Sequence, residues 1–193
     1  ILGKLEGLVL NDETLPLWYD LLSCGFKLAP AGMAGTGLSR TYVRVPGGFT
    51  YERYLRHLRQ GEVFVTTGPV LQLLVDGRPP GSELRVEPGE TVSVEGGAWK
   101  DGKLYSAELV INGKVVKTGS RIDHRLRVER SSWIALRSSG AHTGAVTVKV
   151  GDLPPIDQQA AERLRERLKR LEAYVRTTAV FVTEETKRSM LAA

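Results

Sequence analysis

One stretch of the sequence indicates the fold most clearly: Ala107-Glu108-Leu109-Val110-Ile111-Asn112-Gly113-Lys114-Val115-Val116. Two apolar, β-prone runs flank an Asn-Gly pair. This is the typical sequence of a tight β-hairpin with a primed turn, because both turn residues adopt positive φ there. The stretch therefore predicts antiparallel β-structure centred on Asn112 and Gly113.

Further short segments with strand character surround this hairpin. They are residues 71–75, 90–95, 124–128, 133–136 and 145–150. In 90–95 the alternation places Val92 and Val94 on one face, and Asp76-Gly77 supplies a turn after 71–75. About seven short strands at regular spacing predict an immunoglobulin-like antiparallel β-sandwich over residues 67–152, without the Cys-Trp-Cys pattern of antibody domains.

The N-terminal third has a different pattern. We expect a strand at 5–10, a helix at 14–24, a loop at 29–40, a strand at 41–45, a helix at 50–60 and a strand at 63–65. This order is typical of an α/β domain, so residues 1–66 are predicted to be an incomplete α/β segment. So few elements leave apolar surface uncovered. Trp18, Leu21, Tyr54 and Leu58 should therefore pack on the sandwich or on the C-terminal helix, or else the chain should self-associate.

The tail, residues 153–193, is predicted to be helical and to pack back on the α/β part. Leu164, Leu168, Leu171 and Val175 recur at helical spacing, and Thr183 is a suitable cap for a last helix. The overall class is therefore α+β: an incomplete α/β segment, a β-sandwich and a helical tail.

The composition and charge pattern limit the classes of binding partner that we expect. The 193 residues are 41% hydrophobic and 25% charged, with a net charge of +5, as in ordinary globular proteins. The basic residues of 163–170 alternate with acids and lack aromatics, which favours a solvated helix face with local ion pairs over nucleic-acid binding. No apolar run approaches the roughly 20 residues that span a bilayer, so no membrane contact is expected.

The first residue, the lack of a visible targeting signal and the cysteine content bear on cellular context. The chain begins at Ile1 rather than Met, so we expect a processed product, an excised piece or an incomplete reading frame. No targeting signal is visible. The single cysteine, Cys24, excludes an internal disulfide and a Cys-based zinc site.

No catalytic, cofactor-binding or metal-ligating residue is predicted. The three histidines, His57, His124 and His142, are far apart in sequence and form neither H-x-H nor H-E-x-x-H. His57 and His124 are expected at the surface, and His142 in a loop with a structural role. Cys24 lies at a helix C-terminus, where the dipole does not lower a thiol pKa. Asp12 and Glu13 could pair as carboxylates, but they suit an ordinary helix start.

Nucleophile and phosphate motifs are also incomplete. Residues 37–41 lack the final glycine of a G-x-S-x-G elbow. The glycines of 32–37 have no phosphate-binding lysine at the right offset.

Several strings nevertheless resemble one family, the CehA/McbA-type metallohydrolases. Trp18-Tyr19-Asp20-Leu21-Leu22-Ser23-Cys24-Gly25-Phe26-Lys27-Leu28 is similar to their Trp-Tyr, Leu-Leu, Asn-Cys-Gly-Phe-Arg-Leu segment. The strand at 40–45 resembles their Arg-Val-Tyr-Val, and Gly61-Glu62-Val63-Phe64-Val65-Thr66-Thr67-Gly68-Pro69 resembles Gly-Arg-x-Phe-Val-Thr-Asn-Gly-Pro. Residues 75–78 and Ala141-His142-Thr143-Gly144 resemble further motifs of the family. All these motifs occur in the same order as in the family, along nearly the whole chain.

The resemblance implies a PHP-type α/β domain that binds a divalent metal (Zn, Mn or Fe) and hydrolyses ester, carbamate or phosphoester-type bonds, followed by a β-sandwich. Residues 1–66 would be the end of that domain, and its N-terminal half would bring the H-x-H motif and be the expected partner. Export to the periplasm or outside the cell is possible by the same resemblance.

One departure bears on activity. Family members carry Gly-Thr-Asp or Gly-Ser-Asp in the loop where this chain has Gly35-Thr36-Gly37, and no acid occurs from Phe26 to Tyr51. Either the parent is a degenerate homologue or a deletion has removed the segment. Two functions stay open: a fragment of a metal-dependent hydrolase, inactive as this chain, or a non-catalytic binding module built on the β-sandwich.

Overall fold

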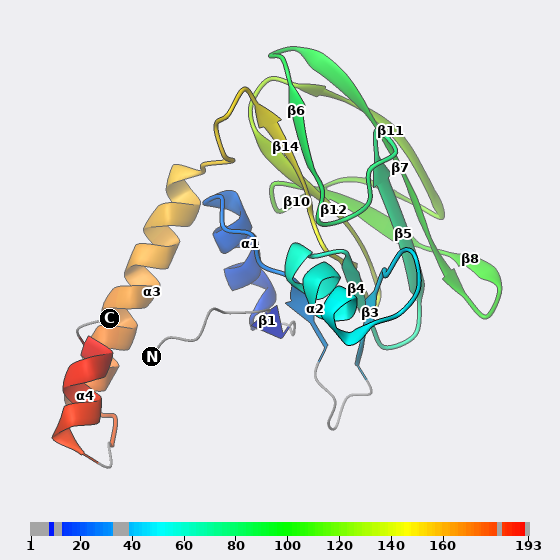
Figure 1. Cartoon of the computed structure of the whole chain (residues 1–193). Coiled ribbons are helices and arrows are strands. Elements are labelled where there is room, and N and C mark those ends of the chain that lie inside the picture. Colours follow the sequence, from blue (N-terminus) through cyan, green and yellow to red (C-terminus); the bar gives the residue numbers. More distant parts are fainter. Residues whose placement is uncertain (1–7, 10–12, 33–38, 181–182, 192–193) are drawn as a thin grey trace.

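The structure, a computed structural model, describes residues 8–9, 13–32, 39–180 and 183–191 (Figure 1). These residues form a mixed α+β molecule with antiparallel sheets and helices, which confirms the predicted class. The predicted strand at 5–10 is described only at Leu8 and Val9, and most of the glycine-containing loop lies outside the described residues.

Two sheets make up most of the molecule. The larger has the order β10-β9-β12-β13-β4-β3, with β14 paired to β12 and β6 paired in parallel to β14. Its strands are β3 (Arg40–Val43), β4 (Val63–Thr66), β6 (Glu83–Val86), β9 (Ala107–Ile111), β10 (Lys114–Gly119), β12 (Ser132–Ser138), β13 (Ala141–Thr143) and β14 (Val146–Val150). The smaller has the order β11-β7-β5, with β8 also on β7. Its strands are β5 (Val70–Val75), β7 (Glu90–Lys100), β8 (Lys103–Tyr105) and β11 (Arg121–Val128).

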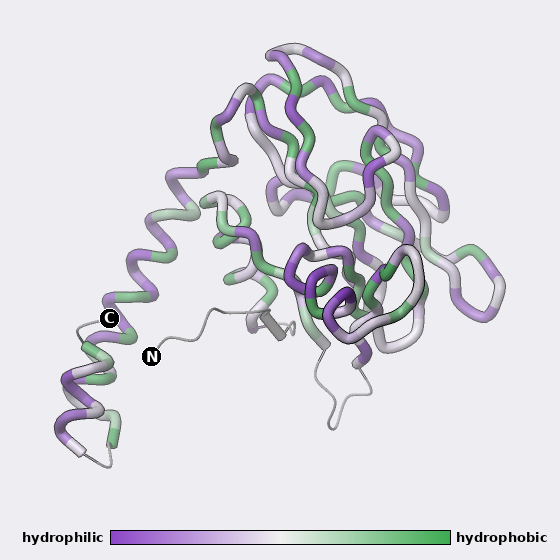
Figure 2. Tube along the Cα trace, viewed as in Figure 1, coloured by the Kyte–Doolittle hydropathy of each residue, from purple (hydrophilic) through white to green (hydrophobic). Residues whose placement is uncertain are grey.

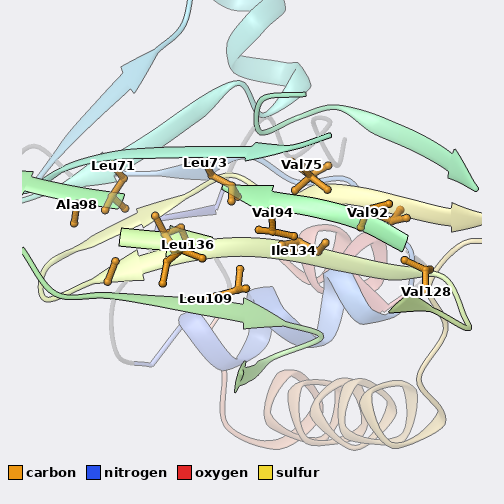
Figure 3. Packing of buried hydrophobic residues seen from close by; sticks show 14 of the residues in the cluster. Leu71, Leu73, Val75, Val92, Val94, Ala98, Leu109, Val128, Ile134 and Leu136 are labelled. Atoms are coloured by element: carbon orange, nitrogen blue, oxygen red, sulfur yellow. The ribbon is translucent and has the colours of Figure 1, made fainter. Parts of the chain in front are cut away.

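The main core lies between these two sheets (Figure 3). Leu73 and Val94 of the smaller sheet face Leu109, Ile134 and Leu136 of the larger, and all five are 2% exposed or less. Burying each of these side chains stabilises the fold by about 1.5–3 kcal/mol. The predicted hairpin is confirmed: Asn112 and Gly113 have φ of 48° and 80° between β9 and β10.

A third, two-stranded sheet pairs β1 (Leu8–Val9) in parallel with β2 (Pro30–Ala31). Helix α1 (Leu15–Ser23) connects them, so these elements form a β–α–β unit. The strand at Pro30 and Ala31 corrects the prediction of a loop over 29–40, and β13 corrects the predicted loop around His142. Short strands without alternation leave too weak a pattern to detect.

The second half of the N-terminal segment is antiparallel. Helix α2 (Tyr51–Gln60) connects β3 to β4, which pair antiparallel, and β4 pairs with β13. The larger sheet therefore crosses the predicted boundary between residues 66 and 67. Thr50 caps α2 by accepting from Arg53 N at 3.2 Å, and Gly61 ends it with φ of 83°. Tyr54 and Leu58 are only half-buried.

The tail is helical as predicted, with α3 (Gln158–Thr177) and α4 (Glu184–Leu191). Asp157 caps α3, and Arg163 binds Asp20 of α1 with Nη2–Oδ1 at 2.6 Å. Figure 2 shows mainly hydrophilic residues along α3, where Arg165–Glu162 and Lys169–Glu166 form the expected local ion pairs.

The expected apolar stripe of the tail is only partly buried. Val175 is 3% exposed, but Leu168 is 66% and Leu171 52% exposed. Helix α3 contacts α1 near its N-terminal end, and in Figure 1 the remainder extends away from the sheets.

We expect Gly81→Ala to destabilise the fold by about 1–3 kcal/mol more than Gly102→Ala. Both glycines have positive φ, 84° and 73°, so the backbone strain of about 1 kcal/mol is shared. Only at Gly81 would a Cβ meet backbone, including Glu62 N at 2.8 Å, where α2 ends against the sandwich. Urea unfolding of both variants measures the difference, and equal destabilisation would contradict this close approach.

Candidate functional site

The structure places the three histidines in different elements. His57 of α2 is not the surface residue that was predicted: its side chain is 16% exposed, and Nδ1 lies 2.9 Å from Glu62 Oε1. Gly61 turns the chain so that Glu62 comes back beside the helix, which the linear pattern does not reveal. His124 is half-exposed in β11, and His142 is 5% exposed in β13.

His142 belongs to an aromatic cluster that joins α1 to the outer face of the larger sheet. Trp18, fully buried, packs on Trp133 of β12 with ring centroids 6.3 Å apart. Its ring also meets His142 edge-on at 5.0 Å, while Tyr19 lies 4.9 Å from Trp133. Of the alternatives expected for Trp18, packing on the strands of the larger sheet is the one observed.

The polar atoms of this cluster are paired. His142 Nδ1 lies 2.8 Å from the Thr143 carbonyl oxygen, which can only accept, so Nδ1 carries the proton. Tyr19 then donates its hydroxyl to Nε2 at 2.7 Å. Trp133 donates to Ser23 Oγ at 2.8 Å, and Trp18 to the Leu28 carbonyl at 3.0 Å.

Burial controls the ionisation of these groups. Desolvation lowers the pKa of His142 to about 4, although the hydrogen bond to Thr143 opposes the shift. Desolvation also raises the pKa of Tyr19, partly offset by Arg137, which pairs with Glu108 at 2.6 Å. At neutral pH both ring nitrogens of the neutral His142 therefore take part in hydrogen bonds within the cluster.

The other residues weighed in the sequence are Cys24, Asp12 and Glu13. Desolvation and nearby Asp20 raise the pKa of the Cys24 thiol, which is partly buried. Asp12 lies outside the described residues, and Glu13 is exposed. Within the described ranges, no three His, Cys, Asp or Glu side chains come together to hold a metal ion. In the same ranges, every helix is too short or too polar to cross a bilayer.

A pocket of about 330 Å³ opens between β5 and the strands β3 and β4. Leu71, Leu73, Phe64 and Tyr42 form its apolar wall. Tyr42 stacks on Phe64 with centroids 4.8 Å apart and planes at 6°, yet it is 45% exposed.

Polar groups stand at the rim of this pocket. Arg44 and Glu62 lie 3.5 Å apart there, beside Gln72. A pocket of this size with an apolar wall and few polar groups is typical of a binding site. No pattern in the sequence predicts this pocket. The only local signal was the pair of aromatic residues in strands 41–45 and 63–65, whose register could not be known.

Comparisons of the chain with family models, with curated proteins and with solved structures found no match.

The buried histidine should make folding stability depend on pH. The pKa of His142 is about 4 when folded and near 6.5 when unfolded, so the unfolded chain binds the proton more tightly. The free energy of unfolding should therefore fall as pH falls from 6.5 to 4, by about 3 kcal/mol in total from this residue.

Urea unfolding at several pH values, on the wild type and on His142→Gln, measures this contribution. The glutamine variant should be less stable at pH 7 but should lose about 3 kcal/mol less on acidification to pH 4. Parallel pH profiles for the two proteins would show that His142 is not buried in its neutral form.

Proposed function

We propose that this chain is the C-terminal part of a metal-dependent hydrolase of the CehA/McbA type, acting on ester, carbamate or phosphoester-type bonds. In this proposal the β1–α1–β2 unit is the end of a PHP-like α/β domain, and the immunoglobulin-like sandwich follows it. The parallel pairing of Leu8 and Val9 with Pro30 and Ala31 is the observation that carries the proposal.

A parallel sheet of two strands is not a self-sufficient structure. Parallel strands occur in larger sheets that helices cover on both faces. In the described residues, β1 and β2 pair only with each other. The unpaired edges support the idea that further strands of an α/β domain adjoin them, and the N-terminal half of that domain is the partner we propose.

Among the residues that the structure describes, no group fits the divalent metal that the proposed family implies. His142 has both ring nitrogens in hydrogen bonds, and His57 is held by Glu62. The segment from Phe26 to Tyr51, where the family supplies an acidic ligand, contains no acid. We propose that any metal ligands lie upstream and that the chain is inactive by itself.

An extended reading frame tests the proposal. We expect in-frame sequence upstream of Ile1 to contain H-x-H, and the longer protein to hydrolyse a nitrophenyl ester or phosphodiester with added Zn²⁺ or Mn²⁺. EDTA should abolish this activity, and the 193-residue chain should show none. Metal-dependent hydrolysis by the 193-residue chain would contradict the proposed division of the site. An extended protein that lacks metal-dependent activity would point to a degenerate homologue.

A second candidate is a non-catalytic binding module built on the sandwich. The pocket beside Tyr42 and Phe64 favours it, because its apolar wall includes Tyr42, which is 45% exposed. This function would not depend on a metal, so EDTA separates the two candidates.

A further inference from the structure

Strand β5 is the exception among the outer strands of the two main sheets. Its sequence, Val70-Leu71-Gln72-Leu73-Leu74-Val75, contains no charged residue. The other outer strands, β3, β6, β8, β10 and β11, each carry at least one. Charges on edge strands prevent pairing with other chains. An uncharged edge of this kind is therefore a template for an additional strand.

The backbone of β5 shows which groups are open. Asp76 N donates to Ser93 O at 2.9 Å, and Ser93 N donates to Asp76 Oδ1 at 2.7 Å, so the backbone N–H of position 76 faces β7. Antiparallel pairing alternates, so Gln72 and Leu74 also bond to β7, while Leu71, Leu73 and Val75 direct N–H and C=O away from it. Val75 satisfies both groups with Arg78, at 2.9 Å each. The N–H and C=O of Leu71 and Leu73 therefore point to the free side.

The larger sheet already lies beneath that free side. Strand β5 packs over β12 and β13, and the larger sheet continues for two more strands, β4 and β3, beyond it. The pocket lies over these two strands, and its apolar surface includes the exposed Tyr42 and the half-buried Phe64. A strand added next to β5 would cover these two rings.

Strands β4 and β3, which extend beyond β5, restrict what can bind next to β5. In a second copy of the chain, β5 is likewise backed by β12 and β13. If β5 paired with β5 of the second copy, the larger sheet of each molecule would collide with β3 and β4 of the other molecule. A single extended segment has no such obstruction.

We propose that the position beside β5 binds an extended peptide of about five residues by β-strand addition. This proposal rests on the binding function, the second candidate above, and is independent of the hydrolase ancestry. Residues of the peptide opposite Leu71 and Leu73 point toward the same side as these leucines, so they should be apolar and two positions apart. Their side chains would contact Tyr42 and Phe64.

Amide hydrogen exchange tests the open edge without any ligand. The amides of Leu71 and Leu73 should exchange at least about 100-fold faster than those of Gln72 and Leu74, which are bonded to β7. Equal protection of all four amides would mean that the edge is already covered, and would overturn the proposal.

A synthetic peptide tests the ligand class. The probe is acetyl-Lys-Val-Thr-Val-Thr-Val-Lys-amide, and the control peptide has proline at the central valine, because proline cannot donate a strand hydrogen bond. The probe should slow exchange at Leu71 and Leu73, and the control peptide should not. Tyr42→Ala should weaken binding of the probe about tenfold, as expected for loss of a buried aromatic contact.

The matched control variant is Tyr105→Ala, which removes a comparably exposed tyrosine from β8, at 37% against 45% for Tyr42. It should bind the probe like the wild type. Absence of binding at millimolar peptide, equal binding of the proline peptide, or equal loss in both tyrosine variants would each overturn the proposal. None of these outcomes bears on whether a longer chain is a metal-dependent hydrolase.

Discussion

The packing of Trp18 on Trp133 is the contact on which the arrangement of the molecule depends. It holds α1 on the outer face of the larger sheet, and the Tyr19–His142 hydrogen bond supports it from the side. Through α1, the same contact fixes the parallel pair β1–β2, and through Asp20 and Arg163 it fixes the start of α3. Removing so large a buried aromatic side chain costs about 3–5 kcal/mol in typical cores, so this junction is a large part of the stability of such a chain.

Unpaired backbone is the constraint that links structure to function here. A strand edge exposes N–H and C=O groups that need partners or protection. Among the described residues, no further strand pairs with β1 or β2, which supports the proposed larger α/β domain. Strand β5 has no charge to protect its edge, and a pocket lies between it and strands β3 and β4. Both features support a peptide ligand. The two proposals concern different edges and are compatible within one protein.

Local patterns predicted the elements well, and long-range pairing was the part that sequence could not supply. Asn112-Gly113 specified its hairpin, and Thr50 and Gly61 marked both ends of α2, because turns and caps depend on neighbouring residues alone. The antiparallel pairing of β3 with β4 was not expected, since a strand–helix–strand order usually indicates parallel strands. Tyr19 and His142 are 123 positions apart, and no feature of either residue reveals its partner. The pocket at β5 exists because the larger sheet extends beyond the smaller one. The extent of each sheet also depends on long-range strand pairing.

The most direct test of this account is whether α1 and the sandwich unfold as one cooperative unit. Native-state hydrogen exchange in low concentrations of urea measures the opening free energy of single amides. We expect the slowest amides of α1, around Leu22, to reach the same global free energy as those around Ile134 in β12. If α1 instead opened at a far lower free energy while β12 stayed protected, the Trp18–Trp133 junction would not be the contact that holds the molecule together.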